Sequence, residues 1–125
     1  MQQRPTAAEL LADISTLLRQ VIDQVPEWQK HQARVAANLA SIVEREVTLG
    51  PANDEAERAR LATLLDQPTT TDLATLRGQL LKRLNDPTPL DSDESVAIYD
   101  ALLDTVRADL AISKPGYADW TQEET

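Results

Sequence analysis

One stretch of the sequence carries chemically distinctive side chains at helical spacing: His31, Arg34, Asn38 and Arg45. At about 100° per residue, these side chains and Ser41 occupy roughly one quarter of a helical wheel, next to an apolar side. Arginine offers a planar fork for carboxylate or phosphate, and asparagine both donates and accepts hydrogen bonds. Two interpretations remain open. The residues form a recognition surface for a partner or ligand, or an internal network that pairs with a neighbouring helix.

Catalysis by His31 is the third interpretation, and it ranks last. A histidine general base needs a nucleophile and an orienting carboxylate within reach, and the sequence does not indicate either group around His31. The chain has no cysteine and one histidine, which leaves little for a metal or haem site. Phosphate-cradling, dinucleotide-binding, zinc-protease, serine-hydrolase and calcium-loop motifs do not occur. We therefore expect no catalytic residue, no metal and no cofactor, and interpret the chain as a non-enzyme.

Charge is distributed unevenly along the 125 residues. Residues 1–85 carry a net charge of −1, whereas residues 86–125 carry −8 of the total −9. An acidic field of this kind repels phosphate backbones and anionic lipid, so neither nucleic acid nor a membrane surface is an expected partner. The acidic segment serves either solubility or docking on a basic partner.

Apolar residues recur at three- and four-residue steps and predict five helices. The first starts after a Thr6–Glu9 capping box and ends near Val25, before Pro26. The second ends at a Gly50–Pro51 stop signal, with its apolar side on Val35, Ala36, Leu39, Ile42 and Val43. The remaining three are expected from Asp54 to before Pro68, from a cap at Thr71 through Leu84, and over about 93–112.

The loops between these helices are short, so consecutive helices should pack antiparallel. The fold prediction is therefore all-α, a compact bundle of about five helices whose core lies mainly between the first, second and fifth. Residues 1–117 are expected to form one domain, and 118–125 a flexible polar tail. No signal peptide or membrane-spanning apolar run is present, and cysteine is absent, which favours the cytoplasm.

Several blocks of the sequence resemble one family of small bacterial proteins. They are the opening R-P-T-A-A-E-L-L (4–11), the block HQARVAANLASIVERE (31–46), the following LGP, an E-x-x-R-L run (57–61) and a closing I-x-K-P-x-Y (112–117). The similarity spans nearly the whole chain, and its most specific part is H-x-x-R-V-A-A-N. That family is described as a domain of unknown function.

Members of the resembled family are typically encoded beside an aminoglycoside-phosphotransferase-like kinase and an acyl-CoA dehydrogenase. In levulinate catabolism the small subunit assists a kinase that phosphorylates a 4-hydroxyacyl-CoA. The resemblance therefore implies a kinase-accessory subunit, which would either order a mobile element of the kinase or complete an acyl-CoA site shared with it. The alternative is a free-standing helical module that binds other proteins or forms a homo-oligomer. The resemblance assigns no role to the four polar residues at positions 31–45, which are inferred from their spacing alone.

Overall fold

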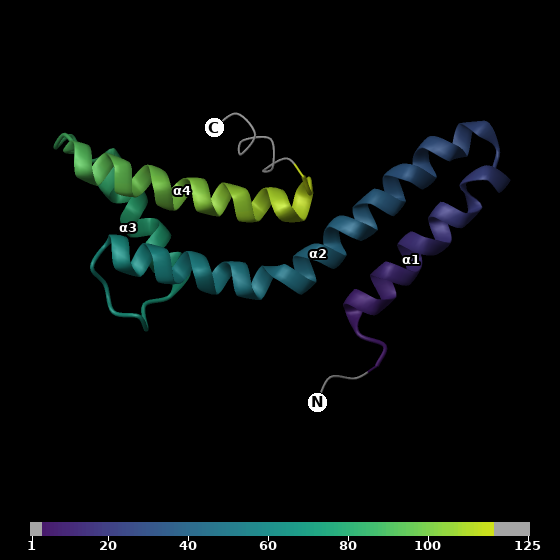
Figure 1. The fold of residues 1–125 in the computed structure, drawn as a ribbon, viewed down its shortest axis with the longest axis horizontal. Helices are drawn as coiled ribbons and strands as arrows, with labels where there is room; N and C mark the ends of the chain where they lie inside the picture. The colour runs from purple at the N-terminus through teal and green to yellow at the C-terminus, as the bar shows by residue number, and fades with distance from the viewer. Residues whose placement is uncertain (1–3, 117–125) are drawn as a thin grey trace. The chain divides into compact units, whose positions relative to one another are not determined.

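The computed structural model describes residues 4–116, and this part of the chain is helical without a strand. It contains four α-helices and one short 3-10 helix, drawn in Figure 1. Their bounds are α1 (Ala7–Val21), η1 (Ile22–Gln24), α2 (Glu27–Leu64), α3 (Leu73–Asn85) and α4 (Ser92–Ser113). The all-α prediction is confirmed. The predicted tail at 118–125 lies outside the described residues.

The predicted number of five helices is wrong, because one helix replaces the expected second and third. Helix α2 runs through Pro51, which cannot donate a hydrogen bond to the carbonyl of Val47 one turn earlier. Gly50 has no side chain to clash with the proline ring, and an added Cβ there would meet nothing within 4 Å. The run from Glu55 to Ala62 consists of strong helix formers, which favours continuation of the helix beyond these local stop signals.

The end of α2 follows the sequence prediction. Asp66 adopts a left-handed conformation with φ of 52°, and the backbone N–H of Gln67 donates to the carbonyl of Ala62 at 2.8 Å. This is a Schellman-type cap, with Pro68 following where the helix cannot continue. This cap ends α2, and the short connection to α3 follows it.

Side-chain caps start the other helices. Thr6 accepts from the N–H of Glu9 at 3.1 Å, as predicted. Asp91 accepts from the N–H of Glu94 at 2.7 Å. The cap of α3 is Asp72 and not the predicted Thr71, because its carboxylate accepts from the N–H of Thr75 at 3.3 Å.

The chain divides into two compact units, residues 1–50 and residues 51–125, each described here by itself. The prediction of one domain over 1–117 stays a prediction. In the first unit, α1 and the N-terminal half of α2 form an antiparallel hairpin (Figure 1). Its seam is made of small side chains: Ser15 donates to the carbonyl of Ala37 at 3.2 Å, and the hydroxyls of Ser15 and Ser41 lie 2.9 Å apart.

The second unit holds the larger hydrophobic core. Its buried members come from the end of α2, from α3 and from α4: Leu61, Ala62, Leu76, Leu80 and Ile98. The prediction that the first, second and fifth helices form the main core is therefore wrong. The buried residues of the hairpin are small (Ser15, Ala37 and Ala40), Leu11 and Leu18 are half-buried, and several larger aliphatic side chains are exposed.

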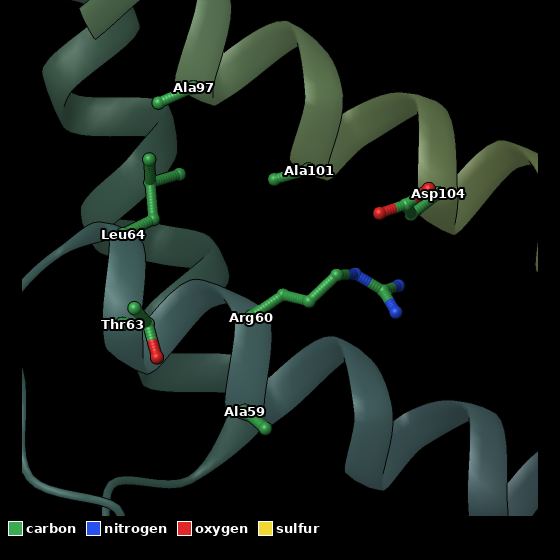
Figure 2. Close-up of a pocket in the computed structure, with 7 residues that line it drawn as sticks. All are labelled: Ala59, Arg60, Thr63, Leu64, Ala97, Ala101 and Asp104. Carbon is green, nitrogen blue, oxygen red and sulfur yellow. The ribbon is translucent and has the colours of Figure 1, made fainter.

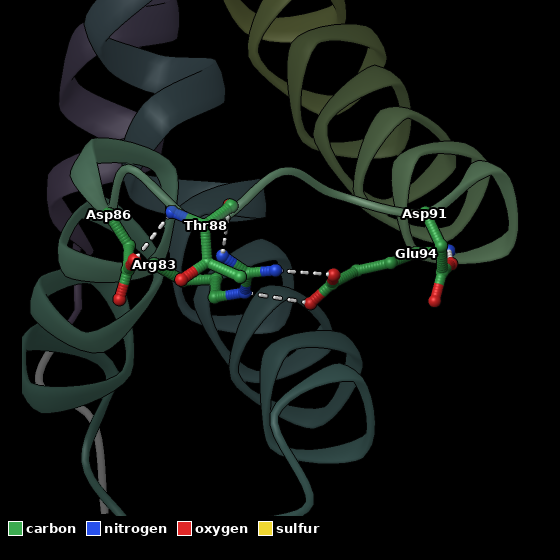
Figure 3. A network of polar contacts seen from close by, with 5 residues as sticks. All are labelled: Arg83, Asp86, Thr88, Asp91 and Glu94. Atoms are coloured by element: carbon green, nitrogen blue, oxygen red, sulfur yellow. Dashed lines mark hydrogen bonds and ion pairs between the residues drawn. The ribbon is translucent and has the colours of Figure 1, made fainter.

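Two bidentate ion pairs brace the second unit. Arg77 on α3 binds Glu57 on α2 at 2.6 and 2.9 Å. Arg83 binds Glu94 on α4 at the same two distances and also donates to the carbonyl of Thr88 (Figure 3). These charge-assisted bonds raise the pKa of both arginines, so both pairs remain charged at any ordinary alkaline pH. They fix α3 relative to α2 and α4.

The loop between α3 and α4 has its own polar lock. The N–H of Thr88 donates to the carboxylate of Asp86 at 2.8 Å (Figure 3). This bond, with help from the Thr88 hydroxyl and the charge of Arg83, lowers the pKa of Asp86. The loop leads to Asp91, the N-terminal cap at which α4 begins.

Candidate functional site

The four predicted site residues all lie on α2 in the hairpin unit. Asn38 accepts a hydrogen bond from Nη2 of Arg19 on α1 at 3.3 Å, and the same nitrogen lies 3.4 Å from the Ser41 hydroxyl. The hydrogen bonds thus link Asn38 to α1. They favour a structural part for this residue, and they place the polar side of α2 beside the polar side of α1.

His31 and Arg34 are exposed, and Arg45 is partly buried. Among residues 4–116, no hydrogen bond or ion pair holds the side chains of His31 or Arg34. These two are therefore accessible to a partner, whereas Asn38 is engaged. Whether the four residues act together as a recognition surface stays a prediction.

Arg19 and Ser15 complete this polar network, and the sequence reasoning missed both. They lie four residues apart on α1, which puts them on one side of that helix. The four-residue spacing of two polar residues within an apolar stripe was the available signal. It could not be paired with Asn38 and Ser41 without the register of the hairpin.

Single substitutions should distinguish a residue with a structural part, Asn38, from a residue that is accessible to a partner, Arg34. Arg34→Ala is expected to change the free energy of unfolding by less than about 0.5 kcal/mol, because the side chain is exposed and unpartnered among the described residues. Asn38→Ala is expected to cost about 0.5–1 kcal/mol through loss of the Arg19 bond. Urea denaturation followed by circular dichroism measures both. Equal losses of unfolding free energy for the two variants would contradict the assignment of a structural part to Asn38 alone.

Helix α4 presents an exposed apolar face in the second unit. It consists of Val96, Tyr99, Leu102 and Val106, between 41% and 65% exposed. Helical spacing places these residues on one side of α4, and puts Asp93, Asp100 and Asp104 together on a neighbouring side. We call the four apolar residues the α4 face. An amphipathic helix that leaves such a face uncovered is typical of a protein-binding surface.

Helix α3 extends this apolar surface. Leu81 and Leu84 are 59% and 44% exposed, and with Leu102 they line a hollow of about 210 Å³. The Glu57–Arg77 ion pair forms another part of its wall. Leu102 thus belongs both to the α4 face and to the lining of this hollow.

A second, larger pocket of about 650 Å³ lies between α2 and α4 (Figure 2). Its walls are small or apolar, and its charged residues are Arg60 and Asp104. Arg60 donates from Nη2 to the Thr105 hydroxyl at 3.0 Å, while its buried Nε has no hydrogen-bond partner among the residues that the structure describes. Among the residues that the structure describes, no group of three His, Cys, Asp or Glu could hold a metal ion.

The family model for a domain of unknown function, DUF6285, matches residues 23–117. The chain belongs to the DUF6285 family. The matched region covers α2, α3 and α4, and so includes the four polar residues and the α4 face. No curated protein and no solved structure matches the chain significantly. In the described part of this DUF6285 chain, no helix has both the length and the hydropathy to cross a membrane.

Proposed function

We propose that this DUF6285 protein is a non-catalytic accessory subunit of a kinase. It binds a phosphotransferase-fold kinase in the cytoplasm and supports phosphorylation of a hydroxyacyl-CoA during short-chain acid catabolism. Two lines of support lead there: the resemblance of its sequence blocks to kinase-accessory proteins, and the exposed α4 face. The α4 face is the observation that carries the proposal.

The α4 face has the pattern of a helix that docks in a groove. Its apolar residues recur at three- and four-residue steps, the spacing with which helical ligands anchor. Tyr99 is 65% exposed and belongs to the residue types that dominate binding energy at interfaces. We propose that the kinase offers an apolar groove for these side chains.

Charge favours a basic rim on that groove. Residues 86–125 carry a net charge of −8, and Asp93, Asp100 and Asp104 lie beside the apolar row. Complementary charge speeds encounter and fixes the orientation of docking, and it suppresses pairing with acidic partners. The kinase supplies its own nucleotide loop and catalytic aspartate in this proposal, so this chain needs neither.

An exposed arginine of the hairpin, Arg34, offers a second contribution. Arg34, with Arg45 on the same stripe, is suited to CoA phosphates or to acidic kinase residues. In this proposal the two arginines and His31 complete an acyl-CoA site shared with the kinase. Asn38 keeps the stripe in place through its bond from Arg19.

A second candidate function is a free-standing interaction or homo-oligomerisation module. A specific observation favours it: the α1 helix exposes Leu10, Ile14 and Leu17, each about half accessible to solvent. These residues belong to the hairpin unit, whereas the α4 face belongs to the other unit. The two candidate functions therefore rest on different units.

A coupled kinase assay tests the proposed function. The phosphotransferase-fold kinase from the same genome is assayed on hydroxyacyl-CoA substrates, with and without this chain. Addition of the chain is expected to raise kcat/KM by at least about 10-fold, equivalent to about 1.4 kcal/mol of transition-state stabilisation. A kinase that is equally active and equally soluble without the chain would refute the proposal.

A further inference from the structure

The hairpin unit has an apolar side made from both of its helices. Helix α1 contributes Leu10, Ile14 and Leu17, and α2 contributes Val35, Leu39 and Val43. All six are between 41% and 59% exposed. We call these six residues the hairpin face. Their exposure is unusual, because the same helices bury alanine and serine in the seam between them.

The register of the hairpin aligns the two rows. Ser15 on α1 lies against Ala37 and Ser41 on α2, so each step forward along α1 corresponds to one step back along α2. Leu10 then falls within one residue of the level of Val43, Ile14 within one residue of that of Leu39, and Leu17 within two residues of that of Val35. The hairpin face therefore has three levels.

The two rows also lie on the same side of the hairpin. The packed side of α1 consists of the buried or half-buried Leu11, Ser15 and Leu18, and that of α2 of Ala33, Ala36, Ala37, Ala40 and Ser41. Relative to the centre of each packed side, both rows are rotated in the same sense along their own helices, by about 100° at 100° per residue. In an antiparallel pair, the same sense of rotation points to one common side. The bonds from Arg19 to Asn38 and Ser41 lie on the opposite side. The hairpin is thus amphipathic as a whole, with one polar and one apolar side.

We propose that a second copy of this chain covers the hairpin face, giving a four-helix bundle. The pattern of the three levels is self-complementary. Each outer level pairs a leucine with a valine, and the middle level pairs isoleucine with leucine. A two-fold axis through the middle level brings the upper level of one copy onto the lower level of the other, with matched side-chain volumes.

The net charges of the two units favour self-association through the hairpin. Residues 1–50 carry five Lys or Arg and six Asp or Glu, a net of −1, so two hairpins meet with little repulsion. Residues 51–125 carry a net of −8, and two such surfaces repel each other. The α4 face is therefore suited to a basic partner, and the hairpin face to its own copy.

The area is adequate for a stable pair. Six half-exposed aliphatic side chains remove on the order of 500 Å² per copy, or about 1,000 Å² in total, before any flanking polar residue is counted. That total reaches the lower bound of specific protein interfaces, and the rim of the bundle adds to it. Burial of the same area also stabilises each hairpin, since an isolated helix pair is marginal in water.

Sedimentation equilibrium of the full chain, from about 5 to about 500 µM, tests this inference. The wild-type chain is expected to show twice its monomer mass with concentration-dependent dissociation. Leu39→Glu places two charges in the symmetric interface and is expected to raise the dissociation constant at least about 100-fold. Tyr99→Glu, at the α4 face, is the matched control and should leave the dimer unchanged.

Circular dichroism on the same samples checks that the variant chains keep their helices. If Leu39→Glu lowers the helical signal, Leu17→Gln replaces it, a milder change at a residue that is 59% exposed. A wild-type chain that stays monomeric at every concentration overturns the inference. So does a helical Leu39→Glu or Leu17→Gln chain that dimerises as tightly as the wild type.

Discussion

Leu76→Ala is expected to lower the free energy of unfolding by about 2–5 kcal/mol, the range for deleting a large buried aliphatic side chain. Leu76 is fully inaccessible to solvent and lies in the cluster that joins α2, α3 and α4. The loss combines the transfer free energy of the removed methyl and methylene groups with the cavity left behind. Urea denaturation with a fluorescence or circular dichroism readout measures it.

Leu81→Ala is the matched control for this prediction. It makes the same chemical change on the same helix, but Leu81 is 59% exposed. Its expected cost is below about 1 kcal/mol, since little apolar area leaves a buried environment. If both substitutions lowered the free energy of unfolding by similar amounts, Leu76 would not lie in a core formed by α2, α3 and α4.

Tyr99→Ala is expected to weaken kinase binding by at least about 30-fold, the loss typical of an aromatic hot spot. The tyrosine is 65% exposed in this chain, so its removal should leave the melting temperature nearly unchanged. The expected effect is therefore on the partner and not on the fold. Titration of the coupled assay with the variant chain gives the concentration needed for half-maximal stimulation.

Trp28→Ala provides the control on the other unit. Trp28 is 69% exposed, also aromatic, and lies at the start of α2 in the hairpin. Its removal is expected to leave the half-maximal concentration within about threefold of wild type. If Trp28→Ala and Tyr99→Ala weaken stimulation equally, the docking surface is not the α4 face.

Short sequence signals predicted where some of the helices begin or end. Thr6 and Asp91 are followed three residues later by glutamate, and both cap their helices through the backbone N–H of that residue. Such signals are local, so a few residues contain the whole interaction. The same reasoning failed at Gly50–Pro51, because local propensity does not weigh the favourable helix on both sides of one lost hydrogen bond.

The location of the core was less predictable. Apolar spacing predicted an apolar side on each helix, but it could not tell which apolar residues would be buried. In the hairpin, Ser15, Ala37 and Ala40 form the seam, which leaves Leu39 and its neighbours accessible. A stripe of leucine and valine in sequence indicates a surface that needs covering, without saying whether the same chain covers it.

The polar residues at positions 31–45 show the same limit. Their common side on α2 follows from helical spacing, which sequence determines. The bond from Arg19 to Asn38 depends on the register between two helices, which spacing on either helix alone does not specify. The α4 face was recognised in sequence only as an acidic segment, because its apolar residues were assigned to the core.

Isothermal titration calorimetry of the purified kinase with this chain tests the central claim most directly. We expect saturable binding with a dissociation constant below about 10 µM, corresponding to about −7 kcal/mol, and a negative heat-capacity change from burial of the α4 face. Tyr99→Ala should weaken that binding at least about 30-fold, and Trp28→Ala should not. No binding by the wild-type chain at about 100 µM kinase, or equal binding by the Tyr99→Ala chain, would contradict the account.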